Sequence, residues 1–170
     1  MNDSTLCFDF GNTRLKCGHF SGDKLLEVFQ MEDASVKTIT ALLQKFNPAK
    51  TILSSVIEHD AGIEKILTEK TNFHKLDSTS KLPFTTPVGK PETIGADRLA
   101  LSAAAVYFYP GKNNLVIGLG SCITFNFINK YNSFLGGSIS PGMVHVPPGN
   151  FRPFSLEPVR LANFGWTNTK

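Results

Sequence analysis

The sequence has few cysteines and none in a metal-binding arrangement. Its three cysteines, at positions 7, 17 and 122, form no CxxC pair, and its four histidines show no metal-ligand spacing. The pattern therefore indicates neither a disulfide framework nor a zinc site. Because each cysteine lies in an apolar, strand-like segment, we expect three reduced thiols in the core of a cytoplasmic protein.

An excess of one charge and long apolar runs are also missing. The net charge is +3, from 17 basic and 14 acidic residues that are scattered along the chain. This balance is too mild to indicate binding to nucleic acid or to a membrane surface. No apolar run approaches the ~20 residues of a membrane span, and the N-terminus lacks the basic and apolar regions of a signal peptide. We expect no nucleic-acid and no membrane partner.

Two nucleotide-binding signatures are absent as well. The chain has no Walker A pattern and no GxGxxG sequence that opens a helix, which argues against P-loop and Rossmann folds. Its 170 residues, of which 41% are hydrophobic, allow one ordinary domain or two small lobes. Strand-like and helical spacings alternate along the chain, which predicts an α/β fold with helices on the faces of a mixed sheet.

The expected elements form two antiparallel meanders with helices between them. We expect strands at 6–10, 14–20, 25–29 and 51–56, helices at 35–46 and 63–71, and an irregular proline-rich loop at 75–91. A helix at 96–109 then leads into strands at 115–118, 122–128 and 134–138. Residues 143–170 contain four of the ten prolines and show no regular spacing, which predicts coil.

One short pattern occurs twice. A strand that carries Asp9 near its end runs into a turn of small polar residues at 11–14, and the pattern returns 109 residues later. Gly11 falls on Gly120, whereas Asp9 falls on Gly118, so the second copy has the turn and lacks the acid. Such spacing suggests two duplicated halves whose glycine turns face a shared cleft.

Asp9 admits two interpretations. An acid at the end of a buried run is costly unless it has a partner, and backbone N–H groups of a turn would be one. Alternatively, its carboxylate faces Mg²⁺ or the waters of that ion, while backbone N–H groups of 11–13 contact phosphate oxygens. The second turn, at 120–121, would then let two loops hold a polyphosphate from both sides.

Two later segments are also open to two interpretations. Asp97 either favours a helix start through the helix dipole or accepts a proton from a substrate hydroxyl. Beside it, Arg98 could hold a carboxylate through a two-pronged contact. The glycine-rich stretch 136–142 is either a flexible turn or a backbone that approaches a ligand closely.

Four segments, taken in order, resemble the type III pantothenate kinases. They are DFGNTRLK at 9–16, PETIGADR at 91–98, GSCIT at 120–124 and GGSISPG at 136–142. The resemblance implies an α/β fold of the acetate/sugar kinase–Hsp70–actin type, in which two ribonuclease-H-like halves enclose a cleft. It implies a first half at 1–112, the start of a second half at 113–142, and an atypical tail at 143–170.

The resemblance implies ATP-dependent phosphorylation of pantothenate to 4'-phosphopantothenate, the first step of coenzyme A biosynthesis. Asp97 would accept the proton of the pantothenate hydroxyl. Pantothenate would contact Gly95, Ala96, Asp97 and Arg98. ATP would contact Asp9, Phe10, Gly11, Asn12, Thr13, Arg14, Leu15, Lys16 and Ser121, with Asp9 also holding Mg²⁺. Family members are homodimers, which implies the same assembly here.

This chain departs from the family pattern at three places. In the family, an aspartate usually binds a monovalent cation, K⁺ or NH₄⁺. Gly118 takes the place of that aspartate here, which argues against a monovalent-cation site in this chain. Val88 stands nearest to the place of a substrate-contacting tyrosine. After Gly142 the resemblance stops, and we interpret 143–170 as the product of a shifted reading frame or a truncated gene. A non-catalytic regulatory relative and an inactive fragment therefore remain alternatives to the enzyme.

Overall fold

The computed structural model of the chain describes residues 3–142, which form two sheets and three α-helices. The first part contains β1 (Ser4–Phe10), β2 (Leu15–Ser21), β3 (Lys24–Met31), α1 (Val36–Phe46), β4 (Lys50–Ser55), α2 (Ala61–Lys70) and β5 (Asn72–Lys75). The short 3₁₀ helix η1 (Pro91–Thr93) precedes α3 (Ala96–Phe108), β6 (Asn114–Leu119), β7 (Cys122–Ile128) and β8 (Phe134–Pro141). The predictions for residues 143–170 lie outside the described part.

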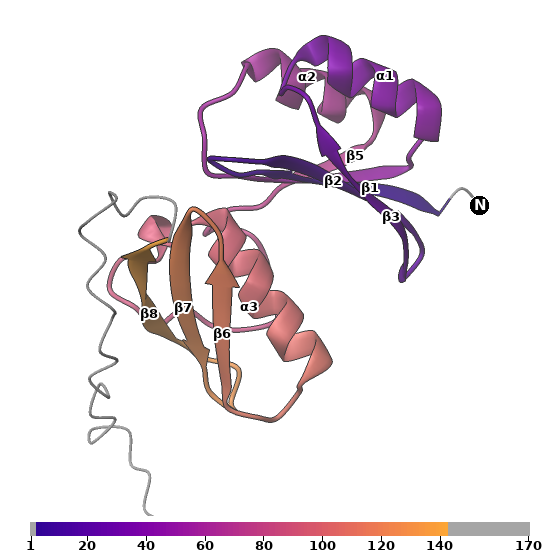
Figure 1. The fold of residues 1–170 in the computed structure, drawn as a ribbon. Helices are drawn as coiled ribbons and strands as arrows, with labels where there is room; N and C mark the ends of the chain where they lie inside the picture. Colours follow the sequence, from indigo (N-terminus) through magenta and orange to yellow (C-terminus); the bar gives the residue numbers. More distant parts are fainter. Residues whose placement is uncertain (1–2, 143–170) are drawn as a thin grey trace, which may run out of the picture.

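The first sheet has the strand order β3-β2-β1-β4-β5. Its first three strands form the expected antiparallel meander, and β4 and β5 then run parallel to β1. Parallel neighbours need crossover connections, which α1 and α2 supply on one face of the sheet (Figure 1). This is the topology of a ribonuclease-H-like half, so the predicted fold class is confirmed.

The larger core lies between this sheet and its two helices. Leu6, Phe8 and Phe10 alternate along β1 and are at most 2% exposed, and they belong to one cluster with Ile39 of α1 and Ile63 of α2. Burying each such side chain contributes about 1.5–3 kcal/mol. Because neighbouring side chains of a strand point to opposite faces, the same alternation directs Asp9 away from this core.

Capping groups explain where the two covering helices begin and end. The hydroxyl of Ser35 accepts a hydrogen bond from the backbone N–H of Thr38 at 3.2 Å, and Asn47 ends α1 in the left-handed region at φ 43°. At the start of α2, the carboxylate of Asp60 accepts a hydrogen bond from the backbone N–H of Gly62 at 2.7 Å. Such caps satisfy backbone groups that a helix terminus leaves unpaired.

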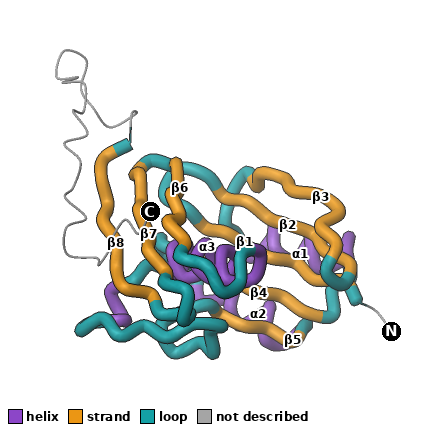
Figure 2. The backbone as a smooth tube through the Cα atoms, turned by 90° about the horizontal axis from the view of Figure 1, so that it is seen from below, coloured by secondary structure: helices purple, strands orange, loops and turns teal. Residues whose placement is uncertain are grey.

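The second sheet has the order β6-β7-β8 and is antiparallel throughout. Helix α3 covers one of its faces, where Leu99 and Val106 pack with Ile128 and Phe134 in a second core. Ile52 of β4 also packs against this core. Helix α3 therefore lies between the two sheets and connects them, as Figures 1 and 2 show from two directions.

Three features differ from the expectations. The sequence pattern does not predict β5 or η1, because β5 is a four-residue strand defined by its pairing with β4 and η1 is a single turn inside the proline-rich loop. All three cysteines are free, but only Cys17 is buried, whereas Cys122 is exposed at the start of β7 and is not the core thiol we expected.

No helix within residues 3–142 combines the length and the hydropathy of a membrane span.

Candidate functional site

Asp9 lies on the face of β1 that α1 and α2 leave free. It is half-buried and pairs across the meander with Lys16 of β2. Burial raises the pKa of Asp9 above its ordinary value, because it disfavours the charged carboxylate. Lys16 opposes this increase, and the nearby charge of Asp97 adds to it. The fold therefore brings together two acids that lie far apart in the sequence.

The turn after β1 is tight and presents polar residues. The backbone N–H of Gly11 donates a hydrogen bond to the carbonyl of Arg14 at 3.2 Å, and a Cβ atom at position 11 would lie only 3.1 Å from that same oxygen. The intervening residues, Asn12 and Thr13, are exposed, and so is Arg14. This turn is accessible to a ligand beside Asp9.

Two of the residues predicted to contact ATP face the core. Phe10 is fully buried under the helices, and its carbonyl already accepts a hydrogen bond from the backbone N–H of Val56 at 3.0 Å. Leu15 is partly buried against the same core. Lys16, by contrast, is exposed on the face that carries Asp9. Of these three side chains, Lys16 is the one placed to meet a ligand.

Asp97 occupies the first turn of α3, as its helix-start interpretation predicts. The residue before the helix, Gly95, makes no side-chain cap, and a Cβ atom there would lie 2.6 Å from Oδ1 of Asp97. The same Cβ position is 3.7 Å from Val56, in the loop after β4. The glycine thus leaves room for the carboxylate where the start of α3 meets the end of the first sheet.

Arg98 is held in place by neutral groups of β7. Its Nε donates to Oδ1 of Asn126 at 2.6 Å, and its Nη2 donates to the carbonyl of Phe125 at 3.4 Å. Burial lowers its pKa, while Asp97 opposes that change. Among the residues that the structure describes, no carboxylate forms an ion pair with Arg98. Its charge is therefore available to an anionic ligand.

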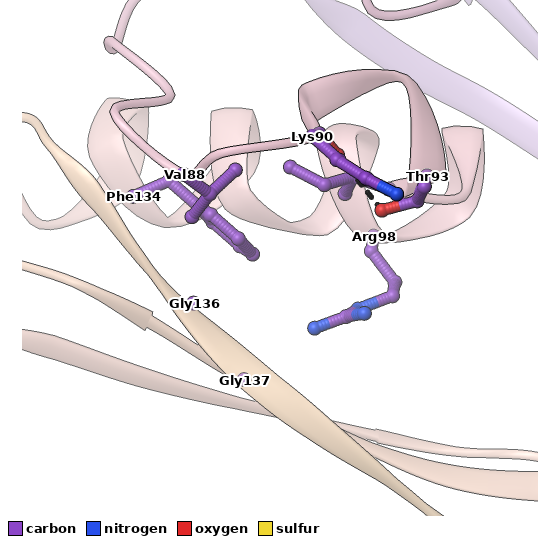
Figure 3. Close-up of a pocket in the computed structure, with 8 residues that line it drawn as sticks. Val88, Lys90, Thr93, Arg98, Phe134, Gly136 and Gly137 are labelled. Atoms are coloured by element: carbon purple, nitrogen blue, oxygen red, sulfur yellow. Dashed lines mark hydrogen bonds between the residues drawn. The ribbon is translucent and has the colours of Figure 1, made fainter.

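Figure 3 shows the cavity beside this guanidinium. The cavity has a volume of about 190 Å³ and is lined by Val88, Lys90, Thr93, Ile94, Arg98, Phe134, Gly136 and Gly137. The hydroxyl of Thr93 donates a hydrogen bond to the carbonyl of Lys90 at 2.8 Å. A half-buried cation, a lysine, a hydroxyl and an aromatic ring thus line this small cavity.

The stretch 136–142 lies mostly within β8 and is not a flexible turn. A Cβ atom at Gly137 would clash with the carbonyl of Phe125 and would lie 2.6 Å from Nη2 of Arg98. The close backbone approach that the sequence suggests is therefore present at this glycine, and the groups approached are the neighbouring strand and Arg98.

Sequence reasoning missed Asn126, which holds Arg98. Its side chain is fully buried, and its amide also donates to the carbonyl of Val116 at 3.4 Å. One signal in the sequence could have indicated it. Asn126 alternates with Phe125 and Phe127 in a predicted strand, and an amide that is buried in a strand requires hydrogen-bond partners.

The second glycine turn lies between β6 and β7. The backbone N–H of Gly120 donates to the carbonyl of Cys122 at 3.0 Å, and the carbonyl of Ser121 accepts from Gly142 at 2.9 Å. Within residues 3–142, no hydrogen bond or ion pair joins this turn to the turn after β1. Joint binding of a polyphosphate by the two turns therefore stays a prediction.

The residues near the first turn offer side-chain ligands for a cation, whereas Gly118, near the second turn, does not. Asp9 and Asp97 offer hard carboxylate oxygens, the donors that Mg²⁺ prefers, and a cation would relieve the repulsion between them. Gly118 offers no side-chain oxygen, and a Cβ atom there would lie 2.7 Å from Oγ1 of Thr124 and 3.1 Å from Leu101. In the described residues, no group of three or more histidine, cysteine or acidic side chains forms a metal cage.

Comparison with known sequences gives one consistent family. Residues 5–146 match the family described as type III pantothenate kinase. The chain is 43% identical over 142 residues to a type III pantothenate kinase of Christiangramia forsetii, which covers 81% of this chain and 58% of the relative. It is 36% identical over 140 residues to one of Flavobacterium johnsoniae, with 81% and 57% covered. The chain thus spans less than three-fifths of the length of these curated relatives.

Comparison with solved structures gives weaker likenesses. A Ppx/GppA phosphatase of Aquifex aeolicus aligns with a TM-score of 0.46 and 12% identity, over 84% of this chain and 54% of the other. The YeaZ protein of Pseudomonas aeruginosa aligns with a TM-score of 0.37 and 7% identity, over 82% and 68%.

Proposed function

Because the chain belongs to the type III pantothenate kinase family, we propose that it binds ATP and pantothenate and transfers the γ-phosphoryl group to the pantothenate hydroxyl. The products are ADP and 4'-phosphopantothenate, which would place the reaction at the start of coenzyme A biosynthesis. The observation that carries this proposal is that Asp97, in the first turn of α3 and followed directly by Arg98, lies near enough to Asp9 of β1 for its charge to raise the pKa of Asp9.

Asp97 is the proposed proton acceptor. As the hydroxyl oxygen of pantothenate attacks the γ-phosphorus and the bond to ADP breaks, its proton passes to the carboxylate of Asp97. The position at the start of α3, against Gly95 and Val56, leaves this carboxylate at the junction between the two parts of the fold. A positioned base of this kind contributes roughly 10²–10⁴-fold to a rate.

Arg98 is the proposed partner of the pantothenate carboxylate. The guanidinium has no carboxylate partner in the described residues and borders the cavity of Figure 3. Asn126 and Phe125 fix its orientation, so little side-chain freedom is lost when an anion binds. Gly95 and Ala96 would contact pantothenate from the same segment.

Asp9 is the proposed ligand of Mg²⁺ or of its waters. Once bound, this ion neutralises charge on the transferring phosphoryl group. Asn12, Thr13 and Arg14 would contact ATP at the exposed turn, and Lys16 would contact it beside Asp9. Gly11, Phe10 and Leu15 would shape the turn, and Ser121 would contact ATP from the second turn. The glycine at position 118 does not suit a monovalent cation, so we propose no requirement for K⁺ or NH₄⁺.

The assembly and the division into halves also belong to the proposal. We place the boundary between the halves after residue 112, in the turn between α3 and β6. A cytoplasmic homodimer, as the family resemblance implies, is the proposed working state.

The test is pantothenate-dependent release of ADP by the purified chain. We expect Asp97→Asn to reduce the rate at least about a hundredfold, and Asp23→Asn, in the turn between β2 and β3, to leave it unchanged. Release of ADP that does not depend on pantothenate, no release at all, or an undiminished rate in Asp97→Asn would contradict the proposal.

A further inference from the structure

Ser54 of β4 carries a buried hydroxyl that forms no hydrogen bond. The residue is 8% exposed, and within residues 3–142 its Oγ has no hydrogen-bond partner. Among the described side chains, Ser102 of α3 carries the one other buried group without a partner. Because an unpaired buried polar group is costly, its presence requires an explanation.

The pairing of β1 with β4 places Ser54 next to Asp9. The two strands are parallel, and Asp9 and Ser54 are direct partners in their register. Leu53 is fully buried in the core under α1 and α2, so the alternation along β4 directs Ser54 to the opposite face. Asp9 lies on that same face, and the two side chains are therefore neighbours near the carboxyl ends of their strands.

The spacing of the strands allows a hydrogen bond between these two side chains. Neighbouring strands lie about 4.8 Å apart, which a serine hydroxyl and an aspartate carboxylate can bridge once Ser54 rotates about its Cα–Cβ bond to another staggered position. A hydroxyl that donates to an ionised carboxylate forms a stronger hydrogen bond than it forms with a neutral acceptor.

The carboxylate of Asp9 would gain from such a donor. Burial disfavours its charged form, and a hydrogen bond to the charged form opposes that effect. Lys16 is the neighbour of Asp9 on the other side, in β2, but no ion pair joins the two within the described part of the chain. Ser54 is thus a donor held beside an acid that needs one.

We propose that Ser54 is a positioning residue for Asp9: its hydroxyl donates a hydrogen bond to the carboxylate of Asp9 and holds it in the orientation that binds Mg²⁺ or the waters of that ion. This inference rests on the proposed role of Asp9 at Mg²⁺. Groups that orient a metal ligand in this way typically contribute about 10–100-fold to the affinity for the metal.

The test measures the affinity of the full 170-residue chain for Mn²⁺, used as a probe in place of Mg²⁺ and without nucleotide. Electron paramagnetic resonance of free Mn²⁺ gives the dissociation constant for the unchanged chain, Ser54→Ala, Asp9→Asn and the matched control Ser102→Ala. The control removes the other unpaired buried hydroxyl, which lies more than one turn after Asp97 in α3.

We expect Ser54→Ala to weaken Mn²⁺ binding at least about tenfold, while Ser102→Ala binds like the unchanged chain. Neither hydroxyl forms a hydrogen bond within residues 3–142, so both variants should keep the Tm of the unchanged chain or exceed it. A role of Ser54 in packing alone would instead lower Tm and leave the affinity for Mn²⁺ unchanged.

Two results would overturn the inference about Ser54 alone. In one, Asp9→Asn weakens Mn²⁺ binding and Ser54→Ala does not. In the other, Ser54→Ala and Ser102→Ala weaken it equally. By contrast, if the unchanged chain does not bind Mn²⁺, or if Asp9→Asn binds it equally well, then the proposed role of Asp9 is wrong and the inference about Ser54 is wrong with it.

Discussion

Replacing Gly137 by alanine tests the packing that holds Arg98. The added Cβ would clash with the carbonyl of Phe125 and approach Nη2 of Arg98 to 2.6 Å. The arginine can move, but the carbonyl belongs to β7, which pairs with β8 at this point through Asn126 and Gly137. Overpacking typically lowers the free energy of unfolding by about 1–3 kcal/mol. We expect a loss near 3 kcal/mol, because the backbone carbonyl of Phe125 cannot move away from the added Cβ as a side chain could.

A loss of about 3 kcal/mol corresponds to a decrease of roughly 6–12 °C in Tm for a chain of this size. Thermal unfolding followed by circular dichroism measures it, with Gly89→Ala as the matched control. Among the described residues, no atom beyond Gly89 and its two chain neighbours lies within 4 Å of a Cβ at this position, so the control should change stability by less than about 0.5 kcal/mol. Equal Tm values for the two variants would refute the close approach at Gly137.

Two further predictions concern thiols and pH. In the native chain at about pH 8, a disulfide reagent should modify the exposed Cys122 first. Cys17 should react only after unfolding, because burial raises its pKa to about 12. Fast labelling of Cys17 in the native chain would contradict its burial. The hydrogen bond from Lys75 lowers the pKa of Glu64, with a smaller contribution from His59. The ionised Glu64 therefore stabilises the folded chain fully above the ordinary glutamate pKa, and this stabilisation is lost as the pH falls through the lowered pKa of Glu64. Urea unfolding between about pH 7 and pH 3 should show a shallower decrease for Glu64→Gln, and parallel curves would exclude this role.

The first half of the fold could be predicted because its signals are local. Alternation along β1 and the helical spacing after Ser35 agree with the buried positions that the structure shows. Strand β5 could not be predicted, since four residues carry too little pattern and their pairing with β4 defines them. The exposure of Cys122 escaped prediction for a related reason, because a strand pattern does not show which residues lie at the end of a sheet.

The candidate site was predictable by residue type and not by its contacts. Asp9 and Asp97 come from separate segments, and their proximity depends on the loop after β4, which brings Val56 against Gly95. The neutral amide of Asn126 beside Arg98 depends on β7 and α3 packing together. Such long-range packing leaves no trace in the spacing of one sequence.

The central claim is that Asp9 and Asp97 share one site, and the titration of Asp9 tests it most directly. Carboxyl ¹³C NMR in magnesium-free buffer can follow Asp9 in the unchanged chain, in Asp97→Asn and in the control Asp23→Asn. Because the charge of Asp97 raises the pKa of Asp9, its removal should lower that pKa towards the ordinary value, while the control leaves it in place. A pKa of Asp9 that is the same in all three proteins would contradict the shared site.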